Sequence, residues 1–224
     1  LLRSRPWLQL DEPTTPLVGK TLCFRLETSI DWKDQTTFHT LQTSGTVSLR
    51  SWNGKQTPIG RVSFEARDGK ANPVSDFLRR RGQPLVARKP LEVTQELNQT
   101  SEGVQIPASN AGYSTFSKDF NPIHISSEFA QYVELPGTIT HGMYTSAVVR
   151  AVAERCAAQG DLTRFRRWAC SFVGMVLPSD QLEVRVQHVA MIEGRLLLNV
   201  TAVKAGTDEA VIQAEAEVDQ PSTV

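Results

Sequence analysis

Hydrophobic and polar residues alternate along several stretches in the first third of the chain. The alternation is clear over residues 21–30 and 59–65, and residues 37–49 are rich in Thr, Val and Phe. A period of two places successive side chains on opposite faces of a sheet, and residues 52–55 are typical of a tight turn. We therefore predict antiparallel strands here, followed by a short helix over residues 72–81.

The second half of the chain changes to a helical spacing and then returns to strands. Apolar residues three and four positions apart predict a short helix over residues 126–133 and a long one over 140–158. We expect one stripe of the long helix to face a sheet. That stripe consists of Met143, Ala147, Val148, Ala151 and Val152. The strands predicted after the helix cover residues 168–173, 181–191, 195–204 and 210–219. This order of elements is typical of an α+β protein.

A short internal similarity favours a second unit in the chain. Residues 17–26 align with residues 177–186, so that Leu22 corresponds to Leu182. Similarity over so short an alternating block also arises by chance, and both interpretations stay open.

The composition of residues 98–112 marks a boundary between the two units. The segment is rich in Gln, Asn, Ser and Gly, which is typical of a connecting segment. We therefore expect a partial unit over residues 1–97 and a main unit over residues 113–224. The chain starts with Leu1 rather than Met, and we expect it to be part of a longer polypeptide.

The overall composition fits a globular chain without net charge. Of the 224 residues 40% are hydrophobic, which is enough to bury a substantial core. The 24 basic residues balance 24 acidic ones, so no overall field attracts a nucleic acid or an anionic membrane. The three cysteines have no CxxC spacing, and the sequence contains neither a secretory signal nor a long apolar run. We expect a cytoplasmic protein with reduced thiols that binds neither nucleic acid nor membrane.

The candidate chemistry centres on Asp119 and His124, which are separated by a segment that contains Asn121 and Pro122. The residue before a proline is disfavoured in the α region, so a continuous helix through the pair is not expected. A bent loop can aim a carboxylate and an imidazole at one point, and an imidazole exchanges protons readily near neutral pH. The pattern favours general acid–base chemistry, without deciding which residue is the acid and which the base.

Residues 137–143 lead into the predicted long helix and include Gly142. The first N–H groups of a helix have no partner within the helix, and the helix dipole favours negative charge there. The N–H of Gly142 is therefore a candidate donor to a developing oxyanion. The sequence has no His, Cys or carboxylate spacing typical of a closed metal site, so we expect no metal. It also lacks a GxSxG motif for a nucleophilic serine.

These residues carry a resemblance to a known family. The pattern Tyr113…Asp119-x-Asn121-Pro122-Ile123-His124, followed by residues 136–143, resembles the MaoC-like, or hydratase 2, family of hot-dog enzymes. The similarity continues through residues 171–178 and is closest to the dehydratase region of fungal fatty acid synthase β subunits. It implies a hot-dog fold, in which an antiparallel sheet wraps one long helix. Residues 113–224 would form the catalytic hot-dog domain, and residues 1–97 a second, partial and non-catalytic hot-dog unit.

The resemblance also implies a function. It points to a dehydratase that converts a (3R)-3-hydroxyacyl group on acyl carrier protein to the trans-2-enoyl group. Asp119 and His124 would bind and activate the water that is added or removed, and Gly142 would stabilise charge on the thioester oxygen. Supporting roles are implied for Asn121, Tyr113 and His141. No cofactor is implied beyond the phosphopantetheine arm of the carrier. The implied partners are acyl carrier protein and the other domains of a fatty acid synthase.

One residue departs from the family pattern. A glycine usually precedes the aspartate, whereas Lys118 occupies that position here. If the position needs a positive φ, a lysine costs about 1 kcal/mol or more. Two other functions stay open, namely a freestanding (R)-specific enoyl-CoA hydratase and a non-catalytic structural module. The length of the acyl group is not readable from the sequence, because it depends on which side chains face the pocket.

Overall fold

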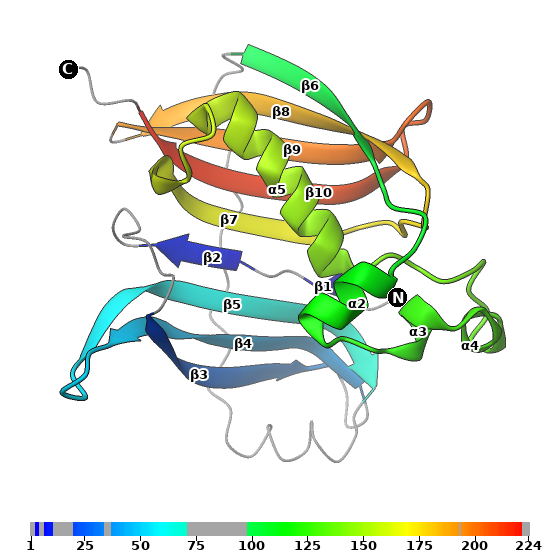
Figure 1. The fold of residues 1–224 in the computed structure, drawn as a ribbon, viewed down its shortest axis with the longest axis horizontal. Coiled ribbons are helices and arrows are strands. Elements are labelled where there is room, and N and C mark those ends of the chain that lie inside the picture. Colours follow the sequence, from blue (N-terminus) through cyan, green and yellow to red (C-terminus); the bar gives the residue numbers. More distant parts are fainter. Residues whose placement is uncertain are drawn as a thin grey trace.

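A computed structural model describes residues 3–4, 7–10, 20–33, 37–70, 98–192 and 194–220. The strands are β1 (Arg3–Ser4), β2 (Trp7–Leu10), β3 (Thr21–Trp32), β4 (Thr37–Arg50), β5 (Gln56–Lys70), β6 (Asn98–Gln105), β7 (Phe165–Phe172), β8 (Gln181–Ile192), β9 (Arg195–Lys204) and β10 (Ala210–Asp219). The helices are α2 (Ala111–Ser117), α3 (Pro122–Ile125), α4 (Ser127–Tyr132), α5 (Gly142–Ala158) and a 3₁₀ turn (Leu162–Arg164). One antiparallel sheet contains the strands, and α5 crosses one of its faces (Figure 1).

The order of the strands in the sheet is β3-β4-β5-β2-β7-β10-β9-β8-β6, with β1 paired to β5. Between β3 and β8 the order is the same when it is read inward from either end. In this symmetry β2, β3, β4 and β5 correspond to β7, β8, β9 and β10. The alignment of residues 17–26 with 177–186 makes β3 the counterpart of β8, which agrees with this topology. Strand β2 joins the two halves, since Leu8 pairs with Val62 of β5 and with Trp168 of β7.

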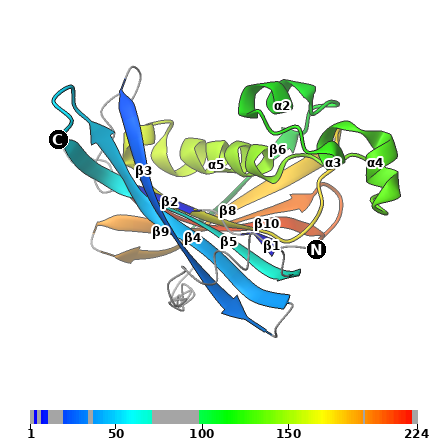
Figure 2. The same cartoon turned by 90° about the horizontal axis from the view of Figure 1, so that it is seen from below.

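The core lies between α5 and the second half of the sheet. Helix α5 contacts β6, β7, β8, β9 and β10 and lies on one side of them (Figure 2). Val149 and Val152 of the helix are fully buried in one cluster with Val184 and Leu198 of the sheet. Burial of each such side chain stabilises the folded state by roughly 1.5–3 kcal/mol.

The predicted long helix is confirmed, but its predicted apolar stripe is displaced: only Val152 of the stripe is buried, while Val148 and Ala151 are half-buried. Met143 is 50% exposed and Ala147 is also exposed, whereas the polar residues Thr145 and Ser146 are buried. Ser146 Oγ accepts a hydrogen bond from Trp168 Nε1 at 2.9 Å. Burying the serine thus gives a partner to a buried indole N–H, which hydrophobicity alone does not predict.

The predicted strands and the short helix over residues 126–133 are confirmed, with small changes in their ends. The helix predicted over residues 72–81 lies outside the described residues. Within the described parts of residues 3–70 the chain forms strands without a helix. The division of the chain into two units stays a prediction.

Residues 98–112 are more than the connection that we expected. They contain β6, which forms an edge of the sheet and pairs with β8, and the first residues of α2. Most side chains of β6 are polar and exposed, as is common in edge strands. The segment therefore has the composition of a loop although it is a strand.

Candidate active site

Two short helices position the candidate pair. Helix α2 ends at Lys118, whose φ of 62° and ψ of 18° are left-handed. Asn121 begins α3, since its Oδ1 accepts from Ile123 N at 3.4 Å and Pro122 follows at the first helical position. Asp119 therefore lies in the loop between the helices. His124 belongs to α3, and not to the bent loop that we expected, because proline is tolerated at the start of a helix.

Lys118 occupies the backbone conformation that glycine adopts without strain. For a residue with a Cβ atom the left-handed region costs about 1 kcal/mol or more. The position thus requires the positive φ that the family glycine suggests, and Lys118 adopts it at this cost.

The tautomer of His124 follows from its hydrogen bond to the backbone. Its Nδ1 lies 2.8 Å from the carbonyl oxygen of Ile139. A carbonyl only accepts, so Nδ1 carries the hydrogen and Nε2 of the neutral ring keeps a free lone pair. Asn110 Nδ2 donates to the carbonyl oxygens of both His124 and Ile139 at 2.9 Å, and thereby fixes α3 against the segment before α5.

The electrostatic environment keeps this ring neutral. Burial lowers the pKa of His124 below its ordinary value of 6.5, and the nearby His141 adds to the decrease. The Ile139 carbonyl and Asp119 oppose it. The lowered pKa means that the neutral form of His124 dominates at pH 7, so that Nε2 can accept a proton.

His141 lies directly against the pair. It is the residue before α5 and is 2% exposed. Its ring stacks on that of His124, with centroids 3.8 Å apart and an angle of 27° between the planes. Its Nε2 lies 3.1 Å from the carbonyl oxygen of Asp119 and 3.4 Å from Ser114 Oγ. The side chains of Asp119, His124 and His141 consequently form one cluster.

This cluster has residue types that also bind metals, and one potential ligand atom of each lies within 4.8 Å of the others. However, the lone pairs of an imidazole lie in the plane of its ring. Two stacked rings direct these lone pairs along nearly parallel planes, and not toward one ion. Nδ1 of His124 and Nε2 of His141 are also engaged with backbone carbonyls. The geometry favours proton transfer over metal binding.

Gly142 is the first residue of α5 and follows His141 directly. A Cβ atom at this position would lie 3.1 Å from the ring of Phe172 on β7. The glycine thus lets the start of the helix approach the sheet closely. The first N–H groups of α5 remain candidate donors to an anion.

The remaining candidate residues have packing and capping positions. The ring of Tyr113 on α2 makes edge-to-face contacts with His141 and Tyr144, with centroids 5.0 Å and 5.4 Å apart. Burial raises the pKa of Tyr113, and the charge of Asp119 adds to the increase, so the phenol keeps its proton. Asn121 caps α3. Asn110 was not predicted as a site residue from the sequence, because an asparagine before a helix is usually a helix cap. In the structure its side chain makes no cap hydrogen bond.

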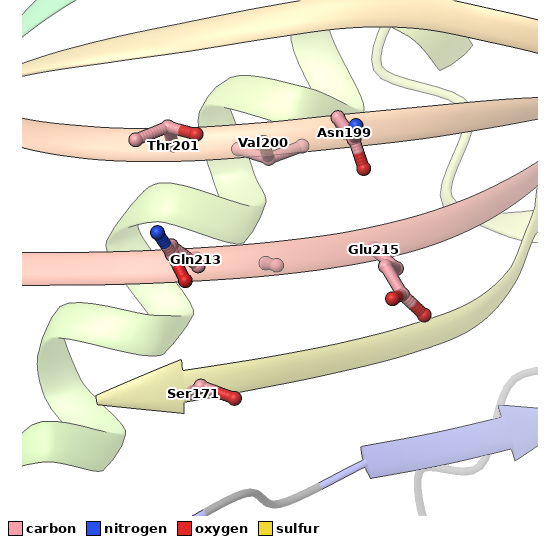
Figure 3. A pocket seen from close by; sticks show the side chains of 7 residues that line it. Ser171, Asn199, Val200, Thr201, Gln213 and Glu215 are labelled. Carbon is pink, nitrogen blue, oxygen red and sulfur yellow. The ribbon is translucent and has the colours of Figure 1, made fainter. Parts of the chain in front are cut away.

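A separate hollow lies on the opposite side of the sheet from α5. It has a volume of about 350 Å³ and is lined by residues of β7, β9 and β10. These residues are Ser171, Asn199, Val200, Thr201, Gln213, Ala214 and Glu215 (Figure 3). It contains none of the candidate residues, so the Asp119 cluster is not part of it.

Comparisons with known proteins identify the class of this fold and site. The family model described as MaoC like domain matches residues 76–210, so the chain belongs to this family. A MaoC-like dehydratase from Phytophthora capsici superposes with a TM-score of 0.72 at 17% identity, over 99% of this chain and 72% of that chain. The peroxisomal multifunctional enzyme type 2 from Drosophila melanogaster superposes with a TM-score of 0.68 at 16% identity, over 97% of this chain and 37% of that chain. These structures confirm the α+β hot-dog fold.

Relatives with higher identity come from fungal fatty acid synthases. The chain is 51% identical over 220 residues to fatty acid synthase subunit beta of Aspergillus oryzae, and 40% identical over 223 residues to that of Saccharomyces cerevisiae. The alignments cover 98% and 100% of this chain, but only 11% of either relative. The model of the fatty acid synthase subunit beta insertion domain also matches residues 1–78. The resemblance to fungal β subunits is thus confirmed over the whole chain.

Among the described residues, each helix is too short or too polar to cross a membrane.

Proposed function

We propose that the chain is a dehydratase that removes water from a (3R)-3-hydroxyacyl thioester to give the trans-2-enoyl thioester, and that it also catalyses the reverse hydration. The observation that carries the proposal is the tautomer of His124. Its Nδ1–H donates to the Ile139 carbonyl, and its ring lies in a cluster with Asp119. Nε2 is therefore free to exchange a proton beside a carboxylate. The family membership of the chain supports the same class of reaction.

In the dehydration direction, Nε2 of His124 takes the proton from the carbon next to the thioester carbonyl. The electron pair left behind forms the carbon–carbon double bond as the bond to the hydroxyl oxygen breaks. The proton passes from His124 to the departing hydroxyl, which leaves as water, and His124 returns to its starting form. Asp119 accepts a hydrogen bond from the hydroxyl and holds it near Nε2. The reaction balances without a cofactor, metal or redox partner.

Loss of that proton places negative charge on the thioester oxygen. The N-terminal end of α5 directly follows His141, whose ring stacks on that of His124, and it offers backbone N–H groups, of which Gly142 is the first. We assign the stabilisation of the oxyanion to this N–H, and a donor of this kind contributes roughly 10²–10³ in rate.

The surroundings of the pair suit an apolar acyl group. Helices α2, α3 and α4 lie together beside the start of α5 at one end of the molecule (Figures 1 and 2). The segment that contains these three helices and the first turn of α5 has exposed apolar side chains, which are Phe116, Phe120, Ile125, Phe129, Tyr132, Val133 and Met143. Such a concentration is typical of a surface that contacts an apolar ligand.

The names of the relatives extend the proposal to the carrier and the assembly. Because they are β subunits of fatty acid synthases, we propose that the acyl group arrives on the phosphopantetheine arm of an acyl carrier protein. The chain would then work with other domains of a cytoplasmic synthase.

A direct assay tests this function. The chain is supplied with 3-hydroxyacyl and trans-2-enoyl thioesters of several lengths, on acyl carrier protein and on CoA, and the enoyl thioester is followed by its absorbance. We expect turnover of the (3R) and not the (3S) substrate, with a higher kcat/KM on the carrier. Equal kcat/KM on CoA would favour a freestanding hydratase. A folded chain without turnover would favour a structural module.

A further inference from the structure

The two histidines of the cluster differ in what they contact. His124 Nδ1 is bound to a backbone carbonyl of the segment before α5, and its Nε2 has no such bond. His141 Nε2 lies 3.1 Å from the carbonyl oxygen of Asp119, so that Nε2 carries the hydrogen. Its Nδ1 is buried and has no hydrogen-bond partner. His141 therefore faces the protein on all sides and does not present a nitrogen to solvent.

The position of His141 before α5 is usually filled by a different kind of residue. Side chains there normally accept a hydrogen bond from the first turn of the helix, as Ser or Asp does. His141 makes no side-chain cap hydrogen bond, which leaves the first N–H groups of α5 uncovered. Its ring instead contacts His124 through one face and meets the edge of Tyr113 with centroids 5.0 Å apart.

We propose that His141 is a positioning residue that holds Asp119 and His124 in one fixed arrangement. A single buried side chain reaches both members of the pair, because its ring face fixes the plane of His124 and its Nε2–H fixes the backbone of Asp119. The Ile139 carbonyl holds the same His124 ring at Nδ1. Together these contacts leave the His124 ring one orientation, in which Nε2 is the free nitrogen.

The same contact bears on the titration of His124. The titratable groups that face it are Asp119 from the loop and His141 from the start of α5, and Tyr113 on α2 packs against His141. The proximity of His141 adds to the lowering of the His124 pKa that burial causes. Without the His141 ring, His124 gains freedom and loses one cause of its lowered pKa. The effect on rate rests on the proposed function, whereas the effect on His124 itself does not.

Titration of His124 by NMR, without substrate, tests the inference. The imidazole nitrogens are followed in the unaltered chain and in the His141→Gln and His141→Phe variants. Glutamine keeps a donor for the Asp119 carbonyl but has no ring face, and phenylalanine keeps the ring face but has no donor. We expect the Nδ1–H tautomer and a low midpoint in the unaltered chain. In the glutamine variant the midpoint should rise and the tautomers should mix, and in the phenylalanine variant the tautomer should persist.

The kinetic arm uses the same variants. We expect kcat to fall by about 10- to 100-fold with a smaller change in KM, because the pair loses its alignment. The acid limb of kcat/KM should move to higher pH in the glutamine variant. His188→Gln is the matched control, since His188 on β8 is also a partly buried histidine but lies outside the cluster. It should leave both the titration of His124 and the rate unchanged.

Two outcomes would overturn the inference. One is an unchanged midpoint and tautomer of His124 in both variants. The other is loss of the folded state in both variants by circular dichroism, which would make His141 a residue of the fold. An unaltered chain without dehydratase activity would contradict the proposed function, while the titration would still decide the role of His141.

Discussion

The two halves of the sheet share a strand order but differ in burial. Strands β2, β3, β4 and β5 correspond to β7, β8, β9 and β10. In β8 the three inward apolar residues are at most 1% exposed, and they are Leu182, Val184 and Val186. The residues aligned with them in β3 are 36%, 58% and 57% exposed, and they are Leu22, Phe24 and Leu26.

Helix α5 explains this difference. Leu26 pairs with Gly45, and Gly45 pairs with Val62. The pairs continue through Leu8 to Trp168, whose side chain contacts Ser146 of α5. The apolar side of β3 is therefore the side of the sheet on which α5 lies. In the described residues, α5 covers this side in the second half, and the first half has no corresponding helix. Apolar alternation therefore identifies which side chains share a face, whereas burial depends on an element that covers it. The Asp119 cluster also belongs to the covered half.

The largest difference between the halves should appear in activity. We expect Asp119→Asn and His124→Ala each to lower kcat/KM by at least about 10²-fold, because each removes a proton-transfer group or its partner. The double variant should lose little more than the worse single one, since both residues act on one hydroxyl. Thr43→Ala is the control in the first half of the sheet, where it removes a 3.1 Å contact with Thr28. A folded Asp119→Asn chain with full activity would contradict the mechanism.

Stability should follow the burial of the two aligned leucines. Leu182→Ala should lower the free energy of unfolding by about 2–5 kcal/mol, because it leaves a cavity under α5. Leu22→Ala should change it by at most about 0.5 kcal/mol, since that side chain is already partly in solvent. Urea denaturation of the two variants measures both values. Equal losses would mean that β3 is covered in solution.

Two left-handed residues in the covered half allow a finer comparison. Lys118 and Gln159 end α2 and α5 with φ values of 62° and 54°. Replacement of either by glycine should raise the free energy of unfolding by up to about 1 kcal/mol, because the strain of the Cβ atom is relieved. Lys118→Gly should also keep or raise activity, while Gln159→Gly should leave it unchanged. A higher KM with unaltered kcat for Lys118→Gly would assign its ammonium to substrate binding.

The smallest expected effect is a pH dependence of stability in the covered half. Burial lowers the pKa of both His124 and His188, so each has a lower pKa in the folded chain than in the unfolded one. Their contribution to stability is present above the ordinary pKa of about 6.5 and is lost as the pH falls toward the folded value. The free energy of unfolding should therefore decrease as the pH falls below about 6.5. Denaturation of His188→Gln should show a smaller decrease, and an identical one would contradict this account.

The sequence predicted most strands because their alternation is local. Residues 195–204 and 210–219 coincide with β9 and β10. Strand β6 was missed because an edge strand pairs through its backbone and needs few apolar side chains. The helix stripe was misplaced because the face of α5 that packs on the sheet includes the polar residues Thr145 and Ser146, and the partner of Ser146, Trp168, is distant in the sequence.

The candidate pair could also be predicted, since Asp119 and His124 are close in the sequence and share a recognisable motif. That Asp119 and His124 are catalytic stays a hypothesis. The tautomer of His124 could not be predicted, because it depends on the Ile139 carbonyl. The stacking of His141 on His124 likewise depends on how α3 meets the start of α5.

Among the described residues, the two halves of the sheet are joined by the short strand β2. It is four residues long and pairs with β7 only over residues 7–9, whereas β10 pairs with β9 along nearly its whole length. Regions of a protein with few backbone pairs open with lower free energies than its well-paired core strands. Backbone amides of β2 should accordingly exchange with solvent sooner than those of β9 and β10. For the same reason we expect a pulling force applied across the sheet to separate β2 from β7 before it separates β10 from β9.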